Sequence, residues 1–174
     1  MAGILKLMGA ALLVGGCTAC GLLGVARLRR RAHALETLLR AFSLLRGEIC
    51  DRLAPMPEVL NRLSRECEYP ANALYRNVYD RLPRLGDAGF PELWREAVAV
   101  TQELMLTPNE SAELCELSST LGRYNVDEQR DAIERAQRRF EEFARAASDA
   151  RDRDGKLFSA LGIAVGAIVV ILLI

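Results

Sequence analysis

Residues 125–174 read NVDEQRDAIERAQRRFEEFARAASDARDRDGKLFSALGIAVGAIVVILLI, and this stretch decides the fold. Its first half has the pattern of a charged amphipathic helix, whereas residues 157–174 carry no charged side chain. The stretch contains no proline, so one helix can run through both halves. Eighteen helical residues cover about 27 Å, roughly the hydrocarbon core of a bilayer. We therefore predict one long helix that begins in water and ends in lipid.

The beginning of the chain contains a second uncharged run, LMGAALLVGGCTACGLLGVA, at residues 7–26. This run is also long enough to span a membrane. The small residues before Cys17 weakly resemble a lipoprotein cleavage site, which would make the run a signal peptide. However, the apolar run continues for nine residues beyond Cys17 and then meets four arginines, which resist export. The pattern favours an uncleaved membrane span.

The basic residues beside the two spans predict their orientation. Four follow the first span and three precede the second: Arg27, Arg29, Arg30, Arg31, Arg151, Arg153 and Lys156. Because basic residues near membrane spans favour the cytoplasmic side, we expect the stretch between the spans in the cytoplasm and both termini across the membrane. The predicted segments are a transmembrane helix at residues 1–26, a cytoplasmic domain at 27–155 and a transmembrane helix at 156–174.

The predicted cytoplasmic segment is long enough for one domain and is nearly neutral. Residues 27–155 can form one hydrophobic core of their own. They contain all 23 acidic residues and every basic residue except Lys6 and Lys156, which leaves a net charge of −2. Such a balance provides no broad basic surface for nucleic acid. We therefore expect no nucleic-acid partner.

Apolar residues between the spans repeat every three to four positions, and prolines or glycines interrupt the repeats. We predict six helices, the first running out of the membrane to residue 53 and the others at about 57–67, 72–82, 91–104, 108–121 and 125–174. Thr107, Pro108 and Glu110 form a helix start of the capping-box type, and Gly122 is expected to end the fifth helix. The stripes place several residues on inner faces, among them Phe42, Leu53, Cys67, Leu82, Trp94, Val100 and Phe140. The predicted fold is all-α, a six-helix cytoplasmic bundle flanked by an N-terminal and a C-terminal transmembrane helix.

The chain shows no pattern typical of an active site or a cofactor site. No glycine-rich loop precedes a Lys-Ser or Lys-Thr pair, which argues against a nucleotide site. His33 follows the arginine cluster and is expected on a helix surface. Cys50, Cys67 and Cys115 lie on apolar helix faces, where we expect buried small apolar residues rather than metal ligands. We therefore predict no enzymatic activity, no catalytic, cofactor-binding or metal-binding residues, and no small-molecule substrate.

Four strings along the whole chain match the pattern of one known family. They are LKLMGA at residues 5–10, an apolar helix within residues 40–60 that carries Glu48-Ile49 and then PMPEVL at 55–60, Leu121-Gly122 followed by Gln129 and Ile133, and KLFSALG at 156–162. On these strings the chain resembles the stage III sporulation protein AB family of endospore-forming bacteria. It departs from the family at Asn125, where we expect aspartate, and at Asp127-Glu128. Asparagine caps a helix as well as aspartate does, so the expected fold is unchanged.

The resemblance implies a non-enzymatic platform or adaptor in the sporulation channel complex between mother cell and forespore. Members of this family are similar to the cytoplasmic helical domain of the type II secretion platform protein. By that analogy, the bundle would lie in the mother-cell cytoplasm and couple a secretion-type ATPase of the same complex to its other membrane proteins and to membrane lipid. The alternative is a membrane-tethered regulatory protein whose bundle binds a soluble signalling partner. Neither hypothesis assigns a partner-binding face to particular residues.

Overall fold

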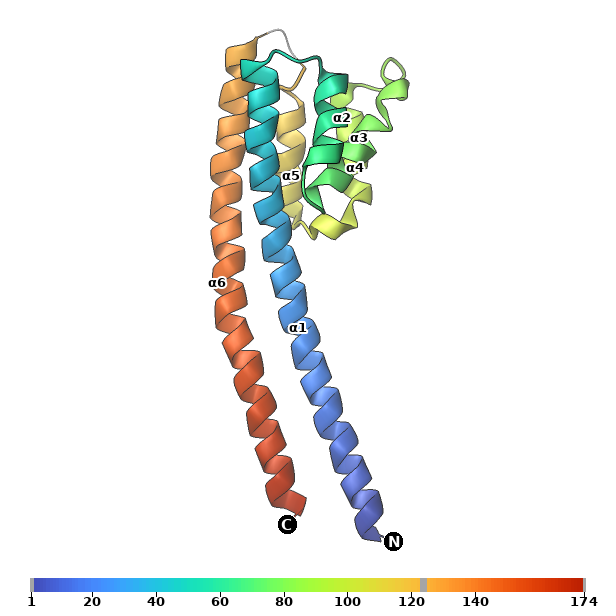
Figure 1. Ribbon diagram of the computed structural model, residues 1–174, viewed down its shortest axis with the longest axis vertical. Coiled ribbons are helices and arrows are strands. Elements are labelled where there is room, and N and C mark those ends of the chain that lie inside the picture. Colours follow the sequence, from blue (N-terminus) through green and yellow to red (C-terminus); the bar gives the residue numbers. More distant parts are fainter. Residues whose placement is uncertain (1, 123–124, 174) are drawn as a thin grey trace. The chain divides into compact units, whose positions relative to one another are not determined.

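The computed structural model describes the backbone of residues 2–122 and 125–173, and the side chains of residue 16 and of residues 23–122 and 125–154. The described residues form six α-helices and no sheet (Figure 1). The helices are α1 (Ala2–Arg46), α2 (Met56–Glu66), α3 (Ala71–Tyr79), α4 (Phe90–Val100), α5 (Pro108–Ser118) and α6 (Val126–Leu173). Three short helical turns of other types connect them: η1 (Gly47–Asp51), η2 (Leu82–Arg84) and η3 (Gln102–Leu104). The prediction of an all-α fold with six helices is confirmed.

The chain divides into two compact units, and each is described here by itself. The bundle is His33–Arg145, and the two-helix unit combines Met1–Ala32 with Ala146–Ile174. The two predicted membrane spans fall in the two-helix unit, and nearly all of their side chains lie outside the described residues. Among the residues that were described, no helix is both long enough and apolar enough to cross a membrane.

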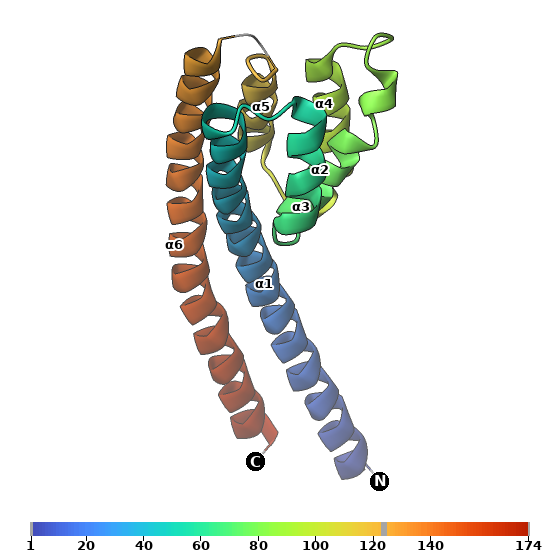
Figure 2. The same cartoon turned by 45° about the horizontal axis from the view of Figure 1, so that its top comes forward.

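Within the bundle, α1 and α6 lie side by side (Figures 1 and 2). The rings of Phe42 on α1 and Phe140 on α6 meet edge to face, with centroids 5.2 Å apart and an interplanar angle of 79°. Phe143 stacks edge-on against Phe140 one turn further along α6, at 5.5 Å. Edge-to-face aromatic pairs contribute beyond the apolar area that they bury. Both Phe42 and Phe140 are fully buried, which confirms their predicted inner positions.

The shorter helices close the core around the only tryptophan of the chain. Trp94 on α4 is fully buried, and its indole N–H donates a hydrogen bond to the carbonyl of Leu114 on α5 (3.0 Å). Its ring also meets Tyr75 of α3 edge to face at 6.1 Å. This contact set joins three helices at one side chain, so the predicted role of Trp94 as a core residue is confirmed. The largest fully buried side chains are Trp94, Tyr75, Phe42, Phe140, Leu35, Leu38, Leu45, Leu60, Leu63, Leu74, Leu93 and Leu104.

Two predicted helix starts are confirmed by their hydrogen bonds. The Thr107 backbone N–H donates to the Glu110 carboxylate (2.7 Å), and the Glu110 N–H donates to the Thr107 hydroxyl (3.4 Å), which completes a capping box for α5. At the start of α6, the Asn125 side-chain oxygen accepts from the N–H groups of Asp127 (3.1 Å) and Glu128 (3.3 Å). Asn125 therefore caps α6, as predicted.

Several predicted helix ends and inner positions are wrong. The first helix loses its regular period after Arg46, because the π-helical turn η1 adds a residue and rotates the following positions off the inner stripe. Leu53 is consequently exposed rather than buried. Val100 is also exposed, because α4 ends there and Thr101 takes the inner position, where its hydroxyl donates to the carbonyl of Ala97 (2.7 Å).

Two further boundaries differ for related reasons. α3 ends at Tyr79, so Leu82 belongs to the turn η2 and is only half-buried. α5 ends at Ser118, three residues before Leu121, and Gly122 follows in a left-handed conformation with φ of +78°. Gly122 therefore stands beyond the helix end rather than directly at it. Cys67 likewise follows the last residue of α2 and is half-buried.

Replacing Phe140 should test whether the contact between α1 and α6 stabilises the bundle. Phe140→Ala removes a fully buried ring and should cost about 3–5 kcal/mol of unfolding free energy. Phe143→Ala, at a half-buried position of the same helix, should cost less than half as much. Urea unfolding of the full chain in detergent micelles, followed by Trp94 fluorescence, measures both. Equal losses of unfolding free energy in the two variants would show that the contact between α1 and α6 at Phe140 does not stabilise the bundle in particular.

Candidate functional site

An open groove lies at the end of the bundle where α1 ends and α6 begins. It has a volume of about 250 Å³. One wall comes from η1 and the segment that follows it, and the other comes from the residues around the start of α6. We name this feature the end groove, and its lining residues are Ile49, Leu53, Ala54, Pro55, Met56, Gly122, Val126 and Gln129. The end groove joins two of the strings that resemble a known family, although they are far apart in the sequence.

The first wall has an unusual backbone. Within η1, the Arg52 N–H donates to the carbonyl of Gly47 (3.1 Å), and the Ala54 N–H then reaches back to the carbonyl of Glu48 (3.0 Å). This closure leaves Leu53 in the left-handed region, with φ of +53°, and its side chain 66% exposed. A non-glycine residue in that region costs about 1–2 kcal/mol, and exposure denies Leu53 the compensating burial. Both π-helical turns and strained residues occur frequently at functional sites.

A buried carboxylate holds this wall in place. The side chain of Glu48 is only 5% exposed, and its Oε1 lies 3.1 Å from Arg52 and 3.3 Å from Arg62 of α2. Arg62 also donates from Nε to Glu66 (2.8 Å), and this hydrogen bond, together with the charge of Glu48, raises the pKa of Arg62. A buried charge is stable only when it is paired. Glu48 therefore ties η1 to α2 and fixes the segment that carries Leu53.

The second wall depends on one side-chain hydrogen bond. The Gln129 Oε1 accepts from the backbone N–H of Gly122 (2.9 Å), and the Gln129 side chain is buried. Gly122 suits this place because its φ of +78° is rarely open to other residues. The bond connects the chain after α5 to the first turns of α6. Both walls of the end groove are thus held by polar contacts that the protein makes by itself.

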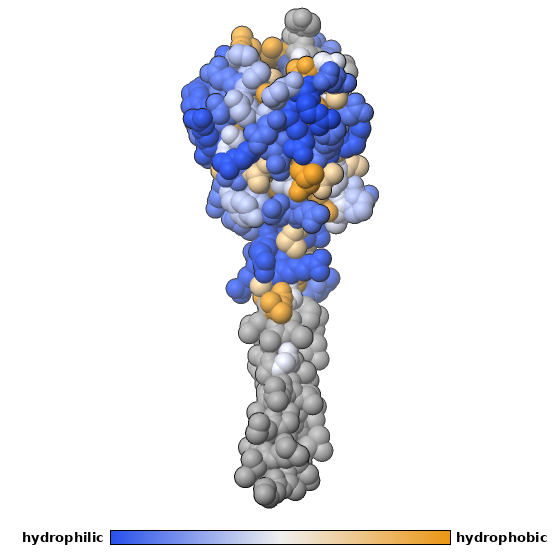
Figure 3. Space-filling view, turned by 90° about the vertical axis from the view of Figure 1, so that its right-hand side faces the viewer, coloured by the Kyte–Doolittle hydropathy of each residue, from blue (hydrophilic) through white to orange (hydrophobic). Residues whose placement is uncertain are grey.

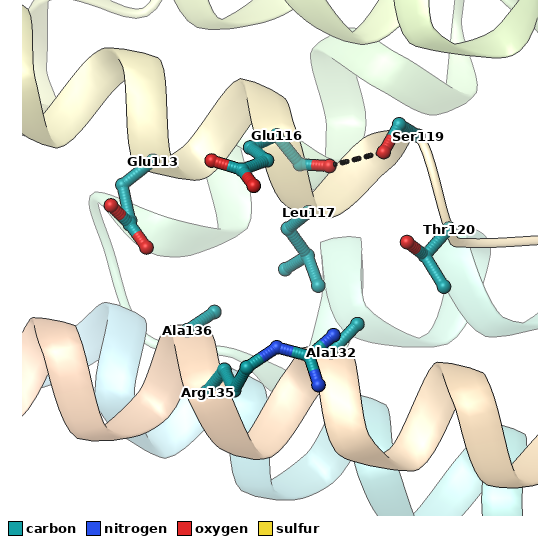
Figure 4. Close-up of a pocket in the computed structure, with 8 residues that line it drawn as sticks. All are labelled: Glu113, Glu116, Leu117, Ser119, Thr120, Ala132, Arg135 and Ala136. Atoms are coloured by element: carbon teal, nitrogen blue, oxygen red, sulfur yellow. Dashed lines mark hydrogen bonds between the residues drawn. The ribbon is translucent and has the colours of Figure 1, made fainter.

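Two other hollows are found on the bundle. One, of about 70 Å³, lies between α5 and α6, where Glu113, Glu116 and Arg135 face it together with Leu117 and Thr120 (Figure 4). It is far below the usual volume of a small-molecule site, roughly 300–1,000 Å³. The other, of about 230 Å³, lies beside α1 and the end of α2 and is lined by Thr37, Arg40, Ala41, Leu44, Glu66, Cys67 and Glu68. There Arg40 donates to Glu68 (2.7 Å), which closes one side with an ion pair.

Exposed apolar residues distinguish the end groove from these hollows. Of the three hollows, only the end groove is lined by a large apolar side chain that is mostly exposed, and that residue is Leu53. Figure 3 shows a face of the bundle that is mostly hydrophilic, with apolar residues in separate spots. Leu53, Ala54, Pro55 and Met56 form a run of apolar residues that are exposed or half-buried, and contiguous apolar surface of this kind is typical of a protein contact.

The described side chains include no cluster of three or more histidine, cysteine or acidic residues that could hold a metal ion. His33 is on the surface, as predicted, with Nε2 3.8 Å from Glu68. Of the three cysteines predicted to be buried, only Cys50 is; Cys67 and Cys115 are half-buried, and all three are free thiols. Burial raises the pKa of each thiol, that of Cys67 to about 11. The absence of catalytic and cofactor-binding residues stays a prediction.

The similarity to known proteins extends over most of the chain and is not confined to the end groove. The profile of stage III sporulation protein AB matches residues 6–174. The chain belongs to the stage III sporulation protein AB family. A solved structure of stage III sporulation protein AB (SpoIIIAB) is similar, with a TM-score of 0.64 and 21% sequence identity, over 71% of this chain and 98% of that chain. No curated protein sequence matches this family member.

Gln129 and Pro55-Met56-Pro57 belong to the strings that resemble the stage III sporulation protein AB family, but these strings do not predict the end groove. The groove depends on the π-helical turn, which has no simple sequence signal. One clue was available at Glu48, an acidic residue that follows Leu45 on an apolar stripe. A carboxylate on the inner face of a helix predicts a buried ion pair, and Arg52 at four-residue spacing is its nearest partner.

Removing the charge of Glu48 should loosen the first wall. Glu48→Gln leaves Arg52 and Arg62 without their shared buried partner and should cost about 1–3 kcal/mol of unfolding free energy. Glu66→Gln is the matched control, because it removes an exposed partner of the same Arg62 and should change the unfolding free energy by less than about 0.5 kcal/mol. Urea unfolding followed by Trp94 fluorescence compares them. Two equally small changes would show that Glu48 is not structurally important.

The raised pKa of Cys67 predicts an unreactive thiol. A shift from 9.0 to about 11 lowers the thiolate fraction at pH 8 by about 100-fold. Alkylation of Cys67 by iodoacetamide, followed by peptide mass spectrometry, should be slower than in the urea-unfolded chain by that factor and should accelerate up to about pH 11. Because the unfolded thiol ionises first, the stability of the bundle should fall as the pH rises from 9 to 11. Equal alkylation rates at pH 8 would contradict the shift.

Proposed function

We propose that this protein is a non-enzymatic platform of the sporulation channel complex between mother cell and forespore. Its bundle would bind a secretion-type ATPase of the same complex in the mother-cell cytoplasm. Residues 7–26 and 157–174 would span the membrane, in contact with lipid and with other membrane proteins of the complex, and both termini would lie on the far side. Membership of the stage III sporulation protein AB family supports the sporulation role.

The observation that carries the adaptor role is the length of the first and last helices. α1 (Ala2–Arg46) and α6 (Val126–Leu173) each belong to both compact units, and neither helix is interrupted where it passes from one unit to the other. A helix without a break keeps its backbone hydrogen bonds along its whole interior. Under this proposal, force applied to the bundle would reach residues 7–26 and 157–174 through the backbone of these two helices.

The charge distribution of the bundle fits a protein partner better than a small ligand. Most of its ion pairs join exposed side chains, such as Arg84 with Glu96 (2.6 Å), and contribute little to stability. The described hollows are all smaller than a typical small-molecule site. A surface of this kind can exchange its water and ion pairs for contacts with another charged protein surface. These features support binding of the ATPase by a face of the bundle.

The proposal predicts binding of the full chain, in detergent micelles, to the secretion-type ATPase of the same organism. We expect a Kd of about 1 µM or tighter in one nucleotide state and at least about fivefold weaker binding in another. Biolayer interferometry with ATP, with ADP and without nucleotide measures the difference. An unrelated two-span membrane protein in the same micelles is the control. No binding above this control would reject the platform role and favour a regulatory protein with a soluble signalling partner.

A further inference from the structure

Three features occur together at the end groove, and none of them stabilises the fold. η1 breaks the regular hydrogen bonding of α1, Leu53 adopts a left-handed conformation, and its apolar side chain remains largely exposed. The neighbouring lining residues Ala54, Pro55 and Met56 are half-buried or exposed as well. A glycine at position 53 would adopt the same conformation at lower cost. The side chain of Leu53 is therefore better explained by a contact outside the chain than by folding.

The end groove is prepared for such a contact before any partner arrives. Glu48 holds the first wall through Arg52 and Arg62, and Gln129 holds the second through the N–H of Gly122. A preformed groove loses little conformational entropy on binding. Its volume of about 250 Å³ suits one or two apolar side chains of a protein segment rather than a complete small molecule.

The charges around the end groove indicate the chemistry of the partner. Three exposed acidic residues, Asp51, Glu58 and Glu128, lie within two positions of lining residues and form no ion pair among the described residues, and Glu128 accepts a hydrogen bond from the Asn125 side chain (3.0 Å). The nearby described arginines are already paired, Arg52 with Glu48 (3.1 Å) and Arg130 with Asp127 (3.7 Å). Exposed carboxylates without an ion pair, close in sequence to the residues of an apolar groove, are complementary to a segment that combines basic and apolar side chains.

We propose that the end groove binds a basic amphipathic segment of the ATPase, an inference that rests on the proposed function. One apolar side chain of this segment would enter the end groove and contact Leu53. Its lysine or arginine side chains would lie near Asp51, Glu58 and Glu128. The apolar contact supplies most of the affinity and the charges supply orientation, because exposed ion pairs are weak and salt-sensitive.

The first test separates binding from folding at position 53. Leu53→Gly and Leu53→Asn both remove the apolar side chain, and both residues tolerate a positive φ. The unfolding midpoint should stay the same or rise, whereas binding of the full chain to the ATPase should weaken by about tenfold or more. Leu85→Asn is the matched control, because Leu85 is another exposed leucine but does not line the end groove, and its binding should stay within about twofold of wild type.

The second test addresses the charges. A triple variant with Asp51→Lys, Glu58→Lys and Glu128→Lys should bind at least about tenfold more weakly at 50 mM salt than the wild-type chain, with a much smaller difference at 500 mM. Glu103→Lys, which reverses an exposed acidic residue outside the end groove, is the control and should have little effect. Unfolding followed by Trp94 fluorescence confirms that each variant is folded.

The outcomes distinguish this inference from the function on which it rests. If the wild-type chain and all end-groove variants bind the ATPase equally, the end groove is not the contact, and the platform role stands with a different face. If only the charge variant weakens binding, a purely electrostatic surface replaces the groove, and the proposed apolar contact is overturned. If the wild-type chain does not bind in any nucleotide state, the platform role and this inference both fall.

Discussion

The bundle depends on the contact between the first and last helices of the chain. Phe42 and Phe140 are both fully buried and meet edge to face at 5.2 Å, although 98 positions separate them in sequence. Because this contact pairs α1 with α6, the segment that connects the two helices must leave from and return to the same end of the helix pair. Four helices of no more than 11 residues meet this condition. Helices this short are marginal alone and take their stability from packing and caps.

The features that could be predicted from the sequence are local. Trp94 is predicted in the core because a large aromatic ring on an apolar stripe is usually buried, and its N–H donates to a carbonyl on the next helix. Thr107 with Glu110, and Asn125 with the residues that follow it, are cap patterns contained within four positions. The all-α class follows from the same short-range periodicity. Each of these predictions depends on residues no further apart than one helical turn or on a single stripe.

The end groove could not be predicted, because its geometry has two non-local causes. The turn η1 shifts the phase of the stripe by one residue, which exposes Leu53 although its spacing from Ile49 is helical. The opposite wall is supplied by Gln129, and only the pairing of α1 with α6 brings the two walls together. Gln129 itself suggests a buried hydrogen bond, since a polar side chain next to an apolar stripe needs a partner when it is buried. That partner, the N–H of Gly122, belongs to a loop whose conformation the periodicity does not describe.

The position of the end groove bears on how a bound partner would act on the bundle under the proposed function. One wall is the turn η1, which follows α1 directly, and the other includes the first turns of α6, so a partner in the groove touches the end of one long helix's continuation and the start of the other long helix. Sliding one helix along the other would separate the rings of Phe42 and Phe140 and expose buried apolar surface. The pair therefore resists shear, and a partner would move α1 and α6 within the bundle together. Under the proposed function, the signal that leaves the bundle is a displacement of the helix pair rather than a rearrangement inside it.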